Sequence, residues 1–173
     1  MRKVRIAVLV SGGGTNLQAL IDAVDKGDIS GEIAAVLSDR ENAYGLERAR
    51  KHGIKAIYIE RKQLAERLIT ELQKLNIELV VLAGFLSILD RELVKAYEGR
   101  IINIHPSLIP SFCGMGFYGE RVHKAALEYG VKVSGTTVHF VDEGTDSGPI
   151  ILQEAVPVYF DDTAETLAAR VLQ

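Results

Sequence analysis

The chain has little of several residue types and patterns that mark particular classes of protein. A single cysteine, Cys113, among 173 residues excludes an internal disulfide and a multi-cysteine metal cluster, so we expect a cytoplasmic protein. No apolar run approaches the roughly 20 residues that span a bilayer, and the stretch from Ile6 to Val10 is too short for a signal peptide. We therefore expect no membrane association.

Positive charge is not in excess either. Lys and Arg number 20 against 23 Asp and Glu, a net charge of −3, whereas most domains that bind nucleic acid carry a basic surplus. We therefore expect no nucleic-acid partner. Hydrophobic residues at 47% and charged residues at 25% are typical of a globular protein, and the length fits a single domain over residues 1–173.

Apolar runs rich in Val, Ile, Leu and Ala alternate with segments of helical period, which is the pattern of successive βαβ units. Because the apolar runs are nearly continuous, they are typical of parallel strands covered on both faces. The pattern predicts an α/β fold with a Rossmann-like, open, mostly parallel sheet flanked by helices, and antiparallel strands toward the C-terminus. The expected strands are 4–10, 33–37, 56–59, 79–83, 101–104, 132–141 and 150–158; the expected helices are 16–25, 46–52, 63–75, 122–129 and one opening at a capping box in 162–165.

The segment from His105 to Glu120 shows neither a strand nor a helix period. Loops of this length in compact domains are usually functional or disordered. This loop also follows the end of a strand, where open α/β sheets bind their ligands. We expect it to border the site.

The first candidate site is the turn Ser11-Gly12-Gly13-Gly14-Thr15-Asn16-Leu17, between the first strand and the first helix. Glycines let the backbone approach an anion, and the helix N-terminus supplies N–H groups and a positive dipole end. The turn therefore favours phosphate binding, although the glycines could also serve only to form a tight turn. It lacks the Lys-Ser/Thr of a Walker loop, and Leu17 replaces the third glycine of the dinucleotide fingerprint. Asp39, after the second strand, keeps a dinucleotide-binding alternative open.

The second candidate is Asn103-Ile104-His105-Pro106-Ser107-Leu108-Ile109-Pro110, at the carboxyl end of a central strand. Alternation along a strand places Asn103 and His105 on one side, so an amide and an imidazole can converge on one ligand atom. Such a pair suits acyl transfer, because both donors can stabilise the oxyanion that forms at a carbonyl under attack. A histidine with a plain structural role is the alternative.

A glycine-rich acidic turn, residues 142–149, separates the last two strands. One of its carboxylates could orient His105 and keep it protonated, whereas a plain hairpin turn or a cation site is the alternative. We expect His123 and His139 to make auxiliary contacts or to pack. Nothing in the sequence near Cys113 would lower its pKa, so we do not expect a nucleophilic cysteine.

Four segments together resemble phosphoribosylglycinamide formyltransferases, the folate-dependent formyltransferases of purine biosynthesis. Their order and spacing fit that family over nearly the whole chain, and the combination is far more specific than any one segment. The segments are residues 11–17, Ala83-Gly84-Phe85-Leu86-Ser87-Ile88-Leu89, Asn103 to Pro110 and Asp142 to Ile151.

The resemblance implies transfer of a formyl group from 10-formyltetrahydrofolate, as co-substrate, to the amine of phosphoribosylglycinamide, with no metal. It implies direct attack by the amine, oxyanion stabilisation by Asn103 and His105, and an Asp146 that keeps His105 charged. The residues implied to bind the phosphoribosyl substrate are Gly13, Gly14, Thr15, Asn16 and Leu17. Those implied to line the folate pocket are Arg61, Leu86, Ser87, Ile88, Leu89, Asn103, Asp142, Glu143, Gly144, Thr145 and Asp146, with Lys62 as an alternative to Arg61.

The sequence departs from the family pattern in two places. The loop over residues 112–119 differs from the shorter form in some relatives, and relatives continue beyond the last helix, so we expect the C-terminal part of the family's domain to be missing. A formyltetrahydrofolate deformylase is one alternative, although such enzymes usually carry a second histidine where Pro106 stands. A non-catalytic nucleotide-binding module, which would need only the glycine turn, is the other. The sequence leaves both a monomer and a homodimer open.

Overall fold

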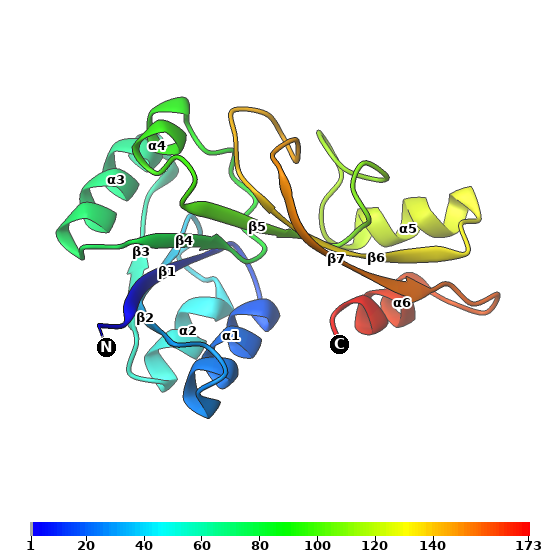
Figure 1. The fold of residues 1–173 in the computed structure, drawn as a ribbon, viewed down its shortest axis with the longest axis horizontal. Helices are drawn as coiled ribbons and strands as arrows, with labels where there is room; N and C mark the ends of the chain where they lie inside the picture. Colours follow the sequence, from blue (N-terminus) through cyan, green and yellow to red (C-terminus); the bar gives the residue numbers. More distant parts are fainter. Residues whose placement is uncertain (1) are drawn as a thin grey trace. The chain divides into compact units, whose positions relative to one another are not determined.

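A computed structural model of the chain describes residues 2–173, shown in Figure 1. The chain forms two compact units, the first extending to Ile102 and the second running from Asn103 to Gln173. Seven strands follow the order β3-β2-β1-β4-β5-β6-β7, and β5 (Ile101–His105) begins in the first unit and ends in the second. This mixed sheet, mostly parallel with antiparallel strands toward the C-terminus, confirms the predicted fold class.

The first unit is built around parallel strands, because β1 pairs with β2 and β4, and β2 pairs with β3, all in parallel. Figure 1 shows α1 and α2 on one face of these strands and α3 and α4 on the other. The strands are β1 (Val4–Val10), β2 (Gly31–Ser38), β3 (Lys55–Tyr58) and β4 (Leu79–Leu82). The helices are α1 (Thr15–Lys26), α2 (Tyr44–Lys51), the 3₁₀ turn η1 (Arg61–Gln63), α3 (Leu64–Lys74) and α4 (Arg91–Ala96).

The core of the first unit follows from the apolar runs. Residues 7–10 of β1 are fully buried, because helices cover both faces of this central strand. Leu17 and Ile21 of α1, four residues apart on one side of the helix, are buried as well. Because β1 to β4 are parallel, they end at the same edge of the sheet, and the loops that follow them lie at this edge.

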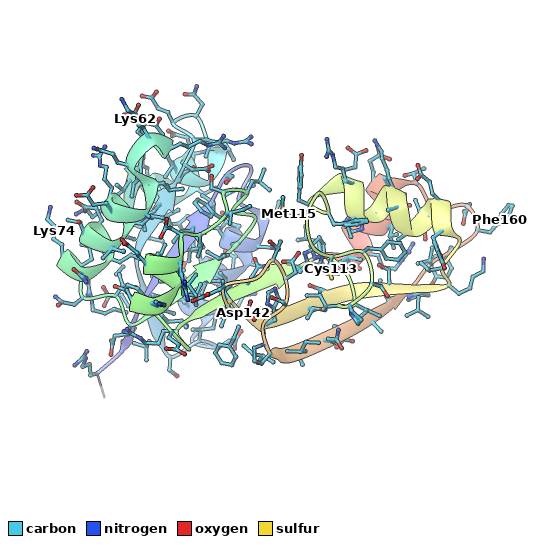
Figure 2. All side chains as sticks on the ribbon, turned by 90° about the horizontal axis from the view of Figure 1, so that it is seen from above. Lys62, Lys74, Cys113, Met115, Asp142 and Phe160 are labelled. Atoms are coloured by element: carbon cyan, nitrogen blue, oxygen red, sulfur yellow. The ribbon has the colours of Figure 1, made fainter. Side chains whose placement is uncertain are left out.

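The second unit contains the antiparallel pair β6 (Val133–Phe140) and β7 (Ile150–Pro157), together with α5 (Glu120–Tyr129) and α6 (Ala164–Val171). The two helices pack against each other. The predicted long loop occupies residues 106–119, between β5 and α5. Figure 2 shows Cys113 and Met115 in this loop, and Phe160 pointing outward near the end of the unit.

Two details differ from the sequence prediction. Helix α4 was not predicted, because its six residues are too short to show a helical period; the side chain of Asp90 caps it by accepting from the N–H of Glu92. At α6 the predicted capping box exists, but Thr163 is the N-cap and Thr166, rather than Glu165, is its reciprocal partner.

Candidate active site

Three polar side chains converge in the second unit at the end of β5. Asn103 Nδ2 lies 3.4 Å from Asp146 Oδ1, and His105 Nδ1 lies 3.5 Å from Asp146 Oδ2. Asn103 and His105 share one side of β5, as alternation predicts, and Asp146 comes from the loop between β6 and β7. The distances are long for hydrogen bonds, which is common in catalytic clusters without substrate.

Asp146 is held as a carboxylate by its surroundings. Burial favours its neutral form, but a hydrogen bond from the charged form of His139, the backbone N–H of Gly114 and the charge of His105 outweigh burial and keep the pKa of Asp146 below its usual value. The Gly114 N–H donates to Oδ2 at 2.9 Å. This contact joins the loop over residues 106–119 to the acidic turn.

His139 on β6 was predicted to make auxiliary contacts or to pack, and it does both. Its side chain is 2% exposed. Nδ1 lies 2.8 Å from the carbonyl oxygen of Phe140, and Nε2 lies 3.1 Å from Asn103 Nδ2. Because a carbonyl only accepts, Nδ1 carries the proton in the neutral ring, and Nε2 then accepts from Asn103. His139 therefore orients the Asn103 amide.

The other nitrogen of His105 faces the long loop. Nε2 lies 2.9 Å from the carbonyl oxygen of Phe112, so it donates there. Burial, with a smaller contribution from the charge of Asp146, raises the pKa of Cys113, so no thiolate nucleophile is expected, as predicted. His123 on α5 is buried, which lowers its pKa, and its Nδ1 has no hydrogen-bond partner among residues 2–173.

The remaining residues of the acidic turn mostly serve the turn itself. Asp142 Oδ1 accepts from the Gly144 N–H at 2.9 Å and from Ser147 Oγ at 2.7 Å. Asp142, labelled in Figure 2, thus closes its own loop. Asp146 is the turn residue that the structure brings to His105. Its backbone is in the left-handed region, with a φ of 54°.

The glycine turn in the first unit is held by α2. The carbonyl of Gly12 accepts from the Gly45 N–H at 2.9 Å, and the carbonyl of Gly13 accepts from Arg48 Nε at 2.8 Å. Gly14 has a φ of 71°, and a Cβ there would lie 2.8 Å from the Cα of Gly45. Only glycine fits this approach without strain.

The predicted phosphate-binding residues follow this turn into α1. Gly14 occupies the N-cap, and Thr15 begins the helix. Leu17 is fully buried in the core, so its backbone N–H, not its side chain, is the group that can face a ligand. Helix N-terminal N–H groups of this kind suit an anion.

A buried carboxylate, Asp39, lies beyond β2 in the first unit. Ser11 Oγ donates to its Oδ1 at 2.6 Å, and Ser87 Oγ donates to its Oδ2 at 2.7 Å. Arg61 donates to Oδ2 from Nε at 3.1 Å and from Nη2 at 2.7 Å. With its side chain 0% exposed and four donors on it, this carboxylate has no room for a ribose hydroxyl. The structure therefore argues against the dinucleotide alternative that Asp39 had kept open.

Residues 86–89 follow β4. The backbone N–H of Leu86 donates to Ser11 Oγ at 2.8 Å, which ties this segment to the glycine turn. The side chains of Leu86 and Ile88 are 42% and 69% exposed, so the segment presents apolar surface next to the hydrogen-bonded cluster around Asp39. Arg61 turns toward Asp39, whereas Lys62 projects outward in Figure 2.

Across residues 2–173 no three His, Cys, Asp or Glu side chains are grouped closely enough to hold a metal ion. Within the same described range, every helix is too short or too polar to cross a membrane.

Comparison with known proteins defines the class. Residues 4–173 match the formyl transferase family, and the chain belongs to that family. Within it, the chain is similar to phosphoribosylglycinamide formyltransferases. It is 43% identical to the one from Haemophilus influenzae over 172 residues, 96% of this chain and 79% of that protein.

Two further relatives extend the similarity. The chain is 42% identical to a chloroplastic phosphoribosylglycinamide formyltransferase of Vigna unguiculata, covering 99% of this chain but only 57% of that protein. The crystal structure of glycinamide ribonucleotide transformylase 1 from Symbiobacterium toebii superimposes with a TM-score of 0.92 at 48% identity, covering 98% of this chain and 81% of that one.

Proposed function

We propose that the protein transfers a formyl group from 10-formyltetrahydrofolate to the amine of phosphoribosylglycinamide, a step of de novo purine biosynthesis. The observation that carries the proposal is the convergence of Asn103, His105 and Asp146 at the end of β5 in a chain of the formyl transferase family. An amide and an imidazole beside a carboxylate suit acyl transfer to an amine.

In the proposed reaction the neutral amine nitrogen attacks the formyl carbon and a tetrahedral oxyanion forms. The Asn103 amide and His105 donate hydrogen bonds to this oxyanion. His105 uses the Nε2–H that the Phe112 carbonyl accepts in the structure, and Asn103 uses the N–H whose contact with Asp146 is long, so both donors exchange a protein acceptor for the oxyanion. The bond from carbon to N10 of the folate then breaks, the attacking nitrogen loses one proton and N10 gains one. Asp146 faces Nδ1 of His105 and assists this proton transfer, so the step needs neither a metal nor a covalent enzyme intermediate.

The proposal also assigns the two substrates. The carbonyls of Gly12 and Gly13 already accept hydrogen bonds from α2, so the N–H groups of the turn are the ones that can face the phosphate. In the proposal the backbone N–H groups of Gly13, Gly14 and Thr15 hold it. Asn16 and the Leu17 N–H complete this set.

The folate is assigned to Arg61, residues 86–89, Asn103 and residues 142–146. The exposed apolar side chains of Leu86 and Ile88 support contact with a flat ring. The single cysteine supports a reducing compartment, for which we propose the cytoplasm.

The test is single-turnover formyl transfer from 10-formyltetrahydrofolate, with and without phosphoribosylglycinamide, followed by the absorbance of the folate product. Product that forms only with the amine supports the transferase. Product that forms equally fast without the amine would show a hydrolase instead. No product and no folate binding would leave a nucleotide-binding module.

Two substitutions connect this assay to the site. His105→Ala and Asn103→Ala are each expected to slow the transfer step by about 10²-fold or more, because each removes an oxyanion donor. His52→Ala is the matched control, since His52 lies at the C-terminal end of α2 in the first unit. A His105→Ala variant with the wild-type rate would contradict the proposed mechanism.

A further inference from the structure

We infer that Asp39 is a positioning residue for substrate binding, one that fixes Arg61 and the segment 86–89 through its buried carboxylate. The inference rests on the proposed function, because it concerns how the folate-binding segments keep their shape. It assigns Asp39 no contact with either substrate. Asp39 acts through its neighbours.

The partners of Asp39 come from segments that follow different strands. Ser11 follows β1, Asp39 follows β2, Arg61 follows β3 and Ser87 follows β4. One carboxylate thus joins the segments after all four parallel strands of the first unit. These segments lie at the carboxyl edge of the strands, where such sheets bind their ligands.

The hydrogen bonds to Asp39 involve a buried charge. The Asp39 carboxylate is fully buried, and hydrogen bonds that involve a charged group in such a place are the stronger ones. Ser11 Oγ both donates to Asp39 and accepts from the Leu86 N–H, so the carboxylate also fixes the backbone at the start of residues 86–89. Without Asp39, two serine hydroxyls and a guanidinium would lose their common acceptor.

Asp39 also fixes the orientation of Arg61. Its Nε and Nη2 both face Asp39 Oδ2, yet 57% of the side chain is exposed. A long arginine side chain in solvent samples many rotamers, and ordering one on binding costs free energy. Asp39 holds Arg61 in one orientation before the substrate arrives, so this cost is largely met during folding.

The test compares KM and Kd for 10-formyltetrahydrofolate with kcat in Asp39→Asn, Arg61→Ala and the double variant. Asp39→Asn keeps the shape of the side chain but removes the charge. We expect its KM and Kd to rise about tenfold with kcat within about twofold of wild type, because only binding is impaired. If Asp39 acts through Arg61, the double variant binds little worse than Arg61→Ala alone.

Stability is separated from binding by Leu72→Val. Leu72 is buried inside α3, about two turns after the N-terminal end of the helix, which is the end that follows Arg61. This variant should therefore unfold more easily with KM unchanged. Should Asp39→Asn fail to fold, Ser11→Ala decides the matter with an expected rise in KM of about threefold, because it removes one donor to Asp39 at a buried residue that is assigned to neither substrate.

Several outcomes would overturn the inference. Wild-type KM and Kd in Asp39→Asn would do so, as would effects of Asp39→Asn and Arg61→Ala that simply add, or a fall in kcat alone. A wild-type protein that binds the folate but does not transfer its formyl group would contradict the proposed function. In that case the Kd values of the wild type and Asp39→Asn would still test the role of Asp39. A wild-type protein that does not bind the folate would overturn both.

Discussion

At the scale of single residues, the site depends on which hydrogen-bonding role each side chain is forced to take. The carbonyls of Phe112 and Phe140 can only accept, so they fix which nitrogen of His105 and of His139 carries a proton. Nε2 of His139 is then unprotonated and accepts a hydrogen bond from the Asn103 amide. Its orientation therefore depends on the charge state of His139.

This dependence predicts an acidic limit on activity. Burial opposes charge on His139, but a hydrogen bond with Asp146 and the Phe140 carbonyl outweigh it and raise the pKa of His139 above its usual 6.5. As the pH falls through that pKa, Nε2 gains a proton and can no longer accept from Asn103. We expect kcat to fall by about tenfold per pH unit on this side, in a pH profile from 5 to 9.

His139→Gln separates titration from packing. A glutamine carbonyl can accept from Asn103 and does not titrate, so the acidic limb should move to lower pH while kcat at neutral pH stays measurable. An acidic limb at the same pH in this variant would mean that His139 does not set it.

A second prediction about a single residue concerns Gly14. Gly14→Ala places a Cβ where φ is 71° and where Gly45 Cα would lie 2.8 Å away. The left-handed backbone alone costs about 1–2 kcal/mol for a residue with a side chain. We expect a loss of stability of at least that size in urea unfolding, and a raised KM for phosphoribosylglycinamide. Gly13→Ala, which meets nothing within 4 Å, should keep wild-type stability.

At the scale of elements, the end of the chain is held by α6. Thr163 accepts from the Thr166 N–H at 3.3 Å, and Thr166 Oγ1 accepts from the Thr163 N–H at 2.9 Å. Thr163→Ala should lower the free energy of unfolding by about 1 kcal/mol, the usual effect of removing an N-cap. Amide exchange in the first turn of α6 should speed up as well.

The matched control is Thr70→Ala. Thr70 lies inside α3 and donates back to the Glu66 carbonyl at 2.9 Å, so its hydroxyl caps nothing. Because alanine is the better helix former, we expect this variant to be as stable as wild type or slightly more so. A larger loss from Thr70→Ala than from Thr163→Ala would contradict the capping role.

Sequence reasoning predicted the long elements well and the short or non-local features poorly. β1 was predicted over its observed residues, Val4–Val10, because a continuous apolar run leaves few alternatives. Asn103 and His105 were found because strand alternation is a local rule. The role of Asp39 was not found, since its partners Ser11 and Ser87 lie 28 and 48 residues away along the chain. No local pattern encodes such contacts.

At the scale of the whole molecule, acidic groups in both units have lower pKa values than free carboxyls. Burial acts against this at Asp39, but hydrogen bonds from Ser11, Ser87 and Arg61 keep its pKa lowered. In the second unit, Asp146 is lowered as described, and hydrogen bonds from Arg170 to Asp162, chief among the causes, lower the pKa of Asp162. Each carboxyl binds protons more weakly when folded than when unfolded.

The sign of the resulting pH dependence follows from linkage. A carboxyl whose pKa is lowered by folding stabilises the protein above its unfolded value, here 3.8, and this contribution is lost as pH falls through the folded pKa. His139, with its pKa raised, contributes in the opposite sense: its stabilisation is present below 6.5 and is lost as pH rises. His123, whose pKa is lowered by burial, acts against His139, because its contribution is present above 6.5 and is lost as pH falls. The carboxyls therefore set the pH dependence on the acid side.

Urea unfolding followed by circular dichroism at pH 7, 5, 4 and 3 would measure this dependence. We expect the free energy of unfolding to fall steeply below about pH 4, as carboxylates in both units take up protons only after unfolding. Asp39→Asn should be less stable at pH 7 but lose less on acidification, because one linked carboxyl is gone. If the variant and the wild type lose stability in parallel, the pKa of Asp39 is the same in the folded and the unfolded protein, and the charged contact with Arg61 would have to be abandoned.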